Sequence, residues 1–253
     1  MYLKCKGVVL REVEFGEADK LIDILTSEHG VITARAKGVR RTKSPLKSAC
    51  QILSYSDFTL FEYRDKSTVQ EAESIEQFRS LRDDIELLSL GSYFAQASSV
   101  VSQADAQNPE LLSLLLNALY ALSVLKKPQL LVKAAFELRL ACIAGFTPFL
   151  NACAICGATA PDRFDLSQGA FQCAVHPHEG GIRLPVTDAV RNAMQYICWC
   201  EPKRLFSFSL GESSLTELSS LTEAYLMTQL EHSFYTLDFY KSLLHHSNTE
   251  PEL

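Results

Sequence analysis

Hydrophobic and polar positions alternate, or β-branched and aromatic residues gather in short runs, over most of residues 2–73. Both patterns are typical of strands, and glycines or short charged turns separate the runs. The strands are expected at residues 3–13, 21–26, 31–37, 52–63 and 68–72. Five short strands are enough to close a small barrel, and an OB-type barrel is the common way to close so few. We therefore predict an N-terminal OB-type barrel domain at residues 1–75.

From residue 78 onward the apolar spacing changes to the period of helices. The motif Asn108-Pro109-Glu110 supplies an N-cap, a first-turn proline and an acid at the positive end of the helix dipole. Gly145 is a good residue to end a helix, and Ser214 and Glu217 have the spacing of a capping box. The expected helices begin at residue 81 and cover residues 111–125, 129–144, 187–198 and 214–244, the last with a break near residue 232.

These patterns predict an α+β protein with the barrel at its N-terminus. A helical domain is expected at residues 76–150 and 183–246, a small insert at residues 151–182, and a disordered tail at residues 247–253. The N-terminus has no apolar signal region, and no stretch approaches the ~20 apolar residues of a membrane span. The protein is therefore expected to be soluble and cytoplasmic.

The insert carries four residues that are typical metal ligands. Cys153 and Cys156 form one pair, and Cys173 and His176 form a second pair with the same spacing. Each short knuckle can aim two side chains at one tetrahedral ion, so we predict a structural zinc, about one per chain. Two alternatives stay open: His178 is also within reach as the fourth ligand, and the four residues could be unrelated.

A closed set of four ligands argues against catalysis, because a catalytic zinc keeps one position open for water. The zinc deaminase motif is not matched, since the Cys-x-x-Cys pair comes first in the chain. No dinucleotide fingerprint, phosphate loop or nucleophile elbow is present either. We therefore predict that the protein is not an enzyme. The other five cysteines are expected to be small buried hydrophobic residues: Cys5, Cys50, Cys142, Cys198 and Cys200.

Charge is divided unevenly along the chain, whose formal net charge is −6. Residues 29–56 contain no acid and hold six cations, namely Arg35, Lys37, Arg40, Arg41, Lys43 and Lys47. Cations at this density can follow a phosphate backbone and release counterions, so these six are our candidate DNA-binding residues, against the alternative of a solvated loop. Strand aromatics nearby could stack on bases, although most such rings are core: Phe15, Tyr55, Phe58, Phe61 and Tyr63.

Several short motifs follow one another along nearly the whole chain. The barrel region contains Gly7-Val-Val-Leu-Arg11, Gly16-Glu-Ala-Asp-Lys20, Leu25-Thr26 with Gly30, and Lys37-Gly-Val-Arg-Arg-x-Lys-Ser44. Later come Phe136-Glu-Leu-Arg-Leu140, Gly145-Phe-x-Pro-x-Leu150, Cys153-x-x-Cys-Gly157 and Gly180-Gly181. In these motifs and their order the chain resembles the bacterial RecO family of recombination mediators.

The resemblance implies a non-enzymatic, nucleoid-associated DNA repair protein of the RecF pathway. Similar proteins bind single- and double-stranded DNA, anneal complementary strands, join RecR, bind the acidic C-terminal tail of the single-stranded DNA-binding protein, and help load RecA. Lys133 and Arg139 are candidates to meet such an acidic tail, with a solvated helix face as the alternative. Two other classes stay open: a zinc-stabilised helical adaptor that binds only proteins, and an enzyme with an unfamiliar site.

Overall fold

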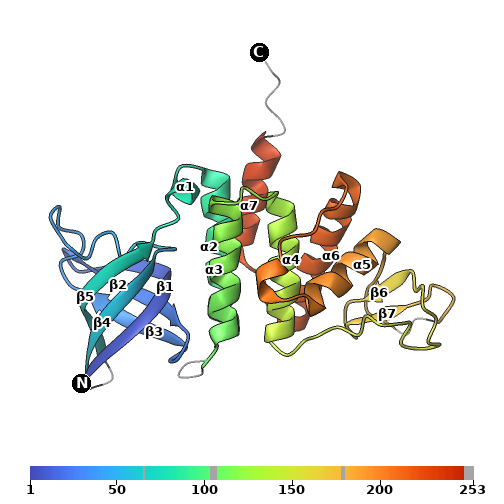
Figure 1. The fold of residues 1–253 in the computed structure, drawn as a ribbon, viewed down its shortest axis with the longest axis horizontal. Coiled ribbons are helices and arrows are strands. Elements are labelled where there is room, and N and C mark those ends of the chain that lie inside the picture. The colour runs from blue at the N-terminus through green and yellow to red at the C-terminus, as the bar shows by residue number, and fades with distance from the viewer. Residues whose placement is uncertain (65, 103–106, 178–179, 248–253) are drawn as a thin grey trace, which may run out of the picture. The chain divides into compact units, whose positions relative to one another are not determined.

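The computed structural model describes residues 1–64, 66–102, 107–177 and 180–247 (Figure 1). The chain divides into two compact units. The first comprises Met1–Leu125 and the segment from Phe234 onward, and the second comprises Lys126–Ser233. This grouping places helices α1–α3 and α7 with the barrel rather than with α4–α6. The domain boundaries expected from the sequence remain a prediction.

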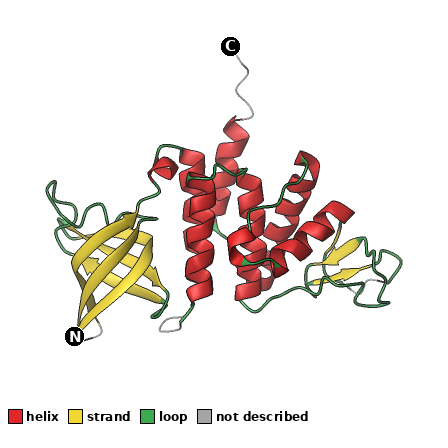
Figure 2. Ribbon diagram, in the orientation of Figure 1, coloured by secondary structure: helices red, strands yellow, loops and turns green. Residues whose placement is uncertain are grey.

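The N-terminal strands form a barrel (Figure 2). The barrel is closed, with the strand order β1-β2-β3-β5-β4. Their pairs are antiparallel except for β3 and β5, which close the barrel in parallel with Arg35 opposite Thr68. The predicted five-stranded, OB-type barrel is thus confirmed. The strand bounds are β1 Tyr2–Phe15, β2 Asp19–Thr26, β3 Val31–Ala36, β4 Tyr55–Tyr63 and β5 Lys66–Glu76.

Alternating side chains of these strands fill the barrel, with Ile22, Ile24 and Phe58 among the fully buried residues. Gly7 on β1 lies close to the backbone of β2: a Cβ atom there would be 2.5 Å from the carbonyl oxygen of Leu25. Atoms cannot approach so closely, so only glycine fits this position without a backbone shift. The alternation along the strands therefore determines which side chains fill the barrel. At Gly7 the absence of a side chain lets β1 and β2 lie close together.

The acid-free segment between β3 and β4 is a series of turns attached to the barrel. Val39, Leu46 and Cys50 are buried in the barrel core, and the segment ends where the Val9 N–H donates to the Ser54 carbonyl at 3.0 Å. The sequence predicted a basic loop here. Its buried apolar residues hold the backbone in place, so the cations between them project from a defined surface.

The helices of the first unit are α1 Arg79–Arg82, α2 Ile85–Val101, α3 Pro109–Ser123 and α7 Tyr235–Ser247. Asp84 interrupts the single helix expected from residue 81, because its carboxylate accepts hydrogen bonds from the N–H groups of Glu86 and Leu87 and so caps α2. Asn108 caps α3 as predicted. Helix α7 packs on α2, where the Phe234 ring meets Tyr93 at 5.4 Å.

The second unit contains α4 Gln129–Ile143, α5 Asp188–Trp199, the 3₁₀ helix η1 Pro202–Arg204, α6 Glu212–Leu230, and a small sheet in the order β7-β6-β8. The sheet strands are β6 Arg163–Asp165, β7 Ala170–Gln172 and β8 Arg183–Pro185. The predicted capping box at Ser214 is wrong, because α6 already begins at Glu212. Its Glu217 carboxylate instead accepts hydrogen bonds from the N–H and hydroxyl of Thr187 at 2.9 and 3.1 Å.

The expected break near residue 232 is confirmed, since α6 ends at Leu230 and α7 begins at Tyr235. Of the tail predicted at residues 247–253, Ser247 is the last residue of α7, and residues 248–253 lie outside the described residues. In the part of the chain that the structure describes, the helices are all too short or too polar to cross a bilayer.

Candidate metal centre and nucleic-acid interface

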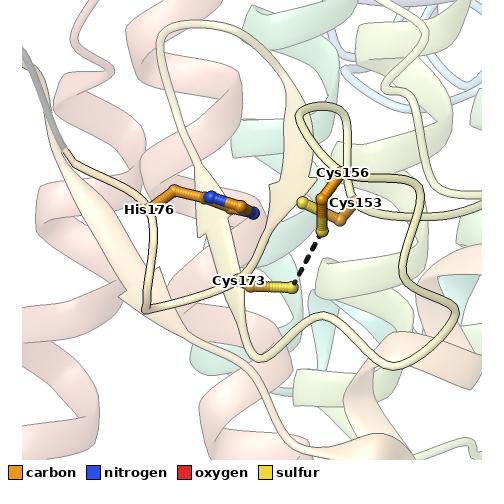
Figure 3. Close-up of side chains that lie close together, drawn as sticks. All are labelled: Cys153, Cys156, Cys173 and His176. Carbon is orange, nitrogen blue, oxygen red and sulfur yellow. Dashed lines mark hydrogen bonds between the residues drawn. The ribbon is translucent and has the colours of Figure 1, made fainter.

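The four predicted metal ligands converge in the second unit. The ligand atoms of Cys153, Cys156, Cys173 and His176 all lie within 4.8 Å of one another, and the side chains point toward a common centre (Figure 3). The Sγ atoms of Cys156 and Cys173 are 3.9 Å apart. His178, the alternative fourth ligand, lies outside the described residues. The structure therefore forms the site from the two pairs that the spacing indicated.

Backbone hydrogen bonds bend both knuckles toward this centre. The Gly157 N–H donates to the Cys153 carbonyl at 2.9 Å, and Gly157 has a φ of +73°, in the left-handed region that glycine adopts at no steric cost. In the second knuckle the His176 N–H donates to the Cys173 carbonyl at 3.2 Å. The hairpin of β6 and β7 lies between the knuckles and packs Phe164 edge-on against Phe171.

Two residues that sequence reasoning missed hold the second knuckle. The Asp162 carboxylate accepts a hydrogen bond from the Ala174 N–H at 2.8 Å. Arg183, on β8, donates to the His176 carbonyl at 3.2 Å. Only the third strand of the sheet brings Arg183 to this position, and a strand of three residues has no clear sequence pattern.

The donor atoms of the cluster are of the kinds that bind metal ions. Burial opposes ionisation of the Cys153 thiol, but the backbone N–H groups of Cys156 and Ile155 outweigh it and lower the Cys153 pKa to about 6. Burial and hydrogen bonds with the neighbouring thiols raise the Cys173 pKa to about 11. The Nε2 atom of His176 is buried and has no hydrogen-bond partner among the described residues. Three sulfurs and an open imidazole nitrogen can hold a metal ion.

The six candidate DNA-binding cations are all exposed in the first unit. Arg35 lies on β3, and the other five follow it in the turns between β3 and β4. The Arg35 guanidinium donates to the Asp19 carboxylate at 2.7 Å, and Arg40 pairs with Glu14 at 3.0 Å. Among the described residues no carboxylate lies within 4.0 Å of the ammonium groups of Lys37, Lys43 and Lys47.

Four of these six cations line two separate hollows. The larger hollow has a volume of about 520 Å³, and we name it the aromatic hollow. Three cations and three aromatic rings line it: Arg35, Lys37, Lys66, Phe15, Phe61 and Tyr63. The smaller, of about 220 Å³, is lined by Arg40 and Lys47 among others. Arg41 and Lys43 belong to neither described lining. Lys66 was not among the candidate cations, because its place in the turn with Arg64 predicted only a hairpin.

The strand aromatics also separate into two groups. Phe58 is fully buried, so the expectation of a core ring holds for it. Phe15 and Tyr63 are 44% and 59% exposed. Tyr55 and Phe61 are half-buried. Phe15 and Tyr63 are thus the exposed rings of the aromatic hollow, and Phe61 is its half-buried ring.

Asp19 joins the start of β2 to the turn after β3. Its carboxylate accepts hydrogen bonds from the Gly38 N–H at 2.7 Å and from Arg35. The Gly38 bond and the Arg35 guanidinium lower the pKa of the Asp19 carboxyl below its ordinary value of 3.8. This single carboxylate therefore orders the backbone next to the cations.

Replacing Asp19 by asparagine should lower the urea midpoint of the first unit near neutral pH. A depressed carboxyl pKa contributes stability above the ordinary value, and that stability is lost as the pH falls through the folded-state value. The difference between Asp19→Asn and the wild type should therefore shrink below pH 3.8. Urea titrations across this range, followed by circular dichroism, check it, and a difference that does not depend on pH would contradict it.

The second unit corrects the expectation for Lys133. Lys133 is only 2% exposed, and its ammonium pairs with Glu137 at 2.9 Å and Glu223 at 2.8 Å. The Arg139 guanidinium donates to the Cys200 carbonyl at 2.8 Å. Lys133 thus lies on neither a solvated face nor an open rim, because the helix packing of α4 on α6 buries it.

The remaining cysteines differ from one another. Cys5 and Cys50 are buried in the barrel as expected, and burial raises their thiol pKa values to about 11 and about 12. Cys142, Cys198 and Cys200 are only half-buried, so the expectation of buried residues is wrong for them. The Sγ atoms of Cys142 and Cys198 lie 3.7 Å apart.

A closed five-stranded barrel with cations on its wall, followed by helices and a cluster of three cysteines and a histidine, defines an α+β protein of the OB-barrel class. Comparison with known families identifies it further. The family models for the N-terminal and C-terminal parts of recombination protein O match residues 1–78 and 82–238. The chain belongs to the RecO family.

Relatives of similar length support this assignment. DNA repair protein RecO of Acetivibrio thermocellus is 36% identical over 247 residues, which cover 96% of this chain and 97% of the relative. DNA repair protein RecO of Alkaliphilus metalliredigens is 30% identical over 249 residues, which cover 96% of this chain and 100% of the relative. The likeness therefore extends through both units, and the resemblance found in the sequence motifs is confirmed.

Proposed function

We propose that the protein is a non-enzymatic DNA repair and recombination mediator that binds single- and double-stranded DNA through its barrel. The observation that carries the proposal is the exposed cations on the barrel and the turns attached to it. Buried apolar residues hold these turns in place, so their cations can meet successive phosphates without reading bases. Membership of the RecO family supports a role in DNA repair.

The proposal includes the wider activities and partners of such a mediator. The protein anneals complementary strands and helps load RecA onto DNA coated by the single-stranded DNA-binding protein. It joins RecR, binds the C-terminal tail of the single-stranded DNA-binding protein, and works at the nucleoid. The cluster of Cys153, Cys156, Cys173 and His176 holds a structural zinc in this proposal. When bound, such an ion cross-links the two knuckles and supplies no open position for catalysis.

A salt titration of the full chain with a single-stranded oligonucleotide tests DNA binding. If about four cations engage phosphates, log K should fall against log salt with a slope near −3, since each contact contributes roughly −0.7. Alanine at Arg40, Arg41 and Lys43 together should flatten the slope by about two units. The fold, by circular dichroism, and the metal content should stay as in the wild type.

The matched control removes three exposed cations of the second unit, Lys126, Lys203 and Arg204. It changes the net charge by the same amount, so it should leave the slope unchanged if binding is local to the barrel. If the variant with alanine at Arg40, Arg41 and Lys43 keeps the affinity and slope of the wild type, the turns between β3 and β4 are only a solvated surface. A wild type that binds no DNA would favour the protein-binding adaptor instead.

A further inference from the structure

Exposed aromatic rings surround one hollow on the wall of the barrel. Phe15 and Tyr63, at the ends of β1 and β4, leave about half of their surface in water, and Phe61 is half-buried and packs against Tyr2 with the ring centres 5.3 Å apart. Burying such a ring is favourable, and barrel aromatics are ordinarily inside, as Phe58 is. Rings kept on the outer wall therefore need a reason beyond folding.

The strand register shows how the sheet builds the aromatic hollow. Arg35 on β3 pairs with Thr68 on β5, and Thr68 pairs with Phe61 on β4. One row across the wall thus carries a guanidinium and a ring two strands apart, roughly 10 Å at ordinary strand spacing. Tyr63 and Lys66 pair directly at the end of the β4–β5 hairpin. The short parallel contact that closes the barrel brings these residues together.

The charges around the rings favour an anionic ligand. The Arg35 guanidinium lies 4.9 Å from the centre of the Phe15 ring, and Arg64 lies 5.1 Å from that of Tyr63. Asp19 already pairs with Arg35, but among the described residues no carboxylate lies within 4.0 Å of the Lys37 or Lys66 ammonium. The described lining itself contains no acid. Its ligand should therefore combine a flat apolar face with negative charge.

A nucleotide of a single strand has this combination. An unstacked base offers its face to an aromatic ring, and the adjoining phosphates offer charge to lysines. A duplex hides its base faces within the stack, so it can use the cations but not the rings. The volume of about 520 Å³ falls within the ~300–1,000 Å³ of ordinary ligand sites.

We propose that the aromatic hollow is the base-stacking site of the barrel: it receives an unstacked base of single-stranded DNA against Tyr63 and Phe15, with the flanking phosphates on Lys37 and Lys66. This inference rests on the proposed function and specifies which surface distinguishes a single strand from a duplex. The exposed turn cations Arg41 and Lys43 then contribute charge alone, to both forms of DNA.

The test compares Tyr63→Leu and Phe15→Leu with the wild type, each as the full chain. Leucine keeps an apolar side chain but has no π-face. Affinity for a single-stranded oligonucleotide should fall about five- to 150-fold for each ring that stacks a base. Affinity for a duplex of equal length and the slope of log K against log salt should stay unchanged, because no phosphate contact is lost.

Tyr63→Phe and Tyr120→Leu serve as controls. The first keeps the ring and should bind as the wild type does. The second removes another exposed tyrosine of the same unit, on α3, and should also leave binding unchanged. An oligonucleotide with abasic sites gives a further readout. The wild type should bind it more weakly than the intact strand, and a variant with both Tyr63→Leu and Phe15→Leu should no longer distinguish the two strands.

Each outcome separates the inference from the function beneath it. A wild type without DNA affinity overturns the proposed function as well. A wild type that binds, with leucine variants that bind single strands equally well, overturns the stacking site alone. Equal losses on single strand and duplex overturn it too, since they show damage to the fold or to phosphate contacts. If the leucine variants lose affinity for an acidic, phenylalanine-containing peptide but keep their affinity for DNA, the hollow would be assigned to a peptide instead.

Discussion

Replacing Cys156 by serine is expected to abolish the metal content of the purified protein and to unfold the small sheet of the second unit. Structural zinc contributes roughly 10–16 kcal/mol of apparent binding energy in small metal modules, and folding of the knuckles depends on it. The wild type should carry about one zinc per chain, and the variant almost none. Elemental analysis measures the metal, and limited proteolysis followed by mass spectrometry should show new cleavage in residues 150–186.

Cys200→Ser is the matched control, because Cys200 lies in the same unit but outside the cluster. It should keep the metal and the resistance to protease. DNA affinity should survive in Cys156→Ser, since the barrel belongs to the other compact unit and has its own core. A wild-type protein that is stable, folded and free of metal would contradict the prediction.

The barrel and the clustering of Cys153, Cys156, Cys173 and His176 were predictable because local patterns encode them. Alternation along a strand determines which face is buried, and a short knuckle directs its two side chains to the same side whatever the rest of the fold does. The third strand of the small sheet was not predictable, because β8 is three residues long and pairs with β6 only in the folded unit.

Pairings between elements account for the errors. Glu217 has the spacing of a capping box, yet Thr187 at the start of α5 is its partner, and this contact exists only after the helices pack. Asp19 neutralises Arg35 because β2 and β3 are neighbours in the sheet. Charge counted along the chain identifies a basic segment but not which of its cations are already paired.

Lys133 shows the same limit in the helical unit. A lysine on a helix ordinarily extends to water, so the sequence indicated either a solvated face or a binding rim. In the structure α6 covers it and supplies Glu223 as a second carboxylate beside Glu137. Burial of a charge depends on the packing partner, and no pattern within α4 reveals that partner.

Replacing Lys133 by methionine is therefore expected to destabilise the second unit by about 3–5 kcal/mol. Methionine fills a similar volume but leaves the fully buried carboxylate of Glu137 without the ammonium that neutralises it. The hydroxyl of Thr222, which donates to Glu137 at 2.9 Å, cannot replace a positive charge. Urea unfolding followed by the fluorescence of Trp199 measures the effect, because the only tryptophan of the chain lies on α5 in this unit.

The pH dependence of the variant identifies the cause. Burial opposes the charged form of Lys133, but Glu137 and Glu223 raise its pKa above the ordinary 10.5, so its contribution is fully present at neutral pH. Without it, the folded state should favour protonated Glu137, and a raised carboxyl pKa gives stability that is lost as the pH rises. The deficit of Lys133→Met should thus be smaller in acid than near neutral pH.

Two further variants decide the interpretation. Adding Glu137→Gln to Lys133→Met should restore most of the lost stability, because an amide needs no counter-charge and can still accept the Thr222 hydroxyl. Lys126→Met changes an exposed lysine of the same unit and should shift stability by no more than about 0.5 kcal/mol. If Lys133→Met alone is as stable as Lys126→Met, the buried ion pair makes no net contribution to stability. Equal losses in acid and near neutral pH would instead assign the effect to packing.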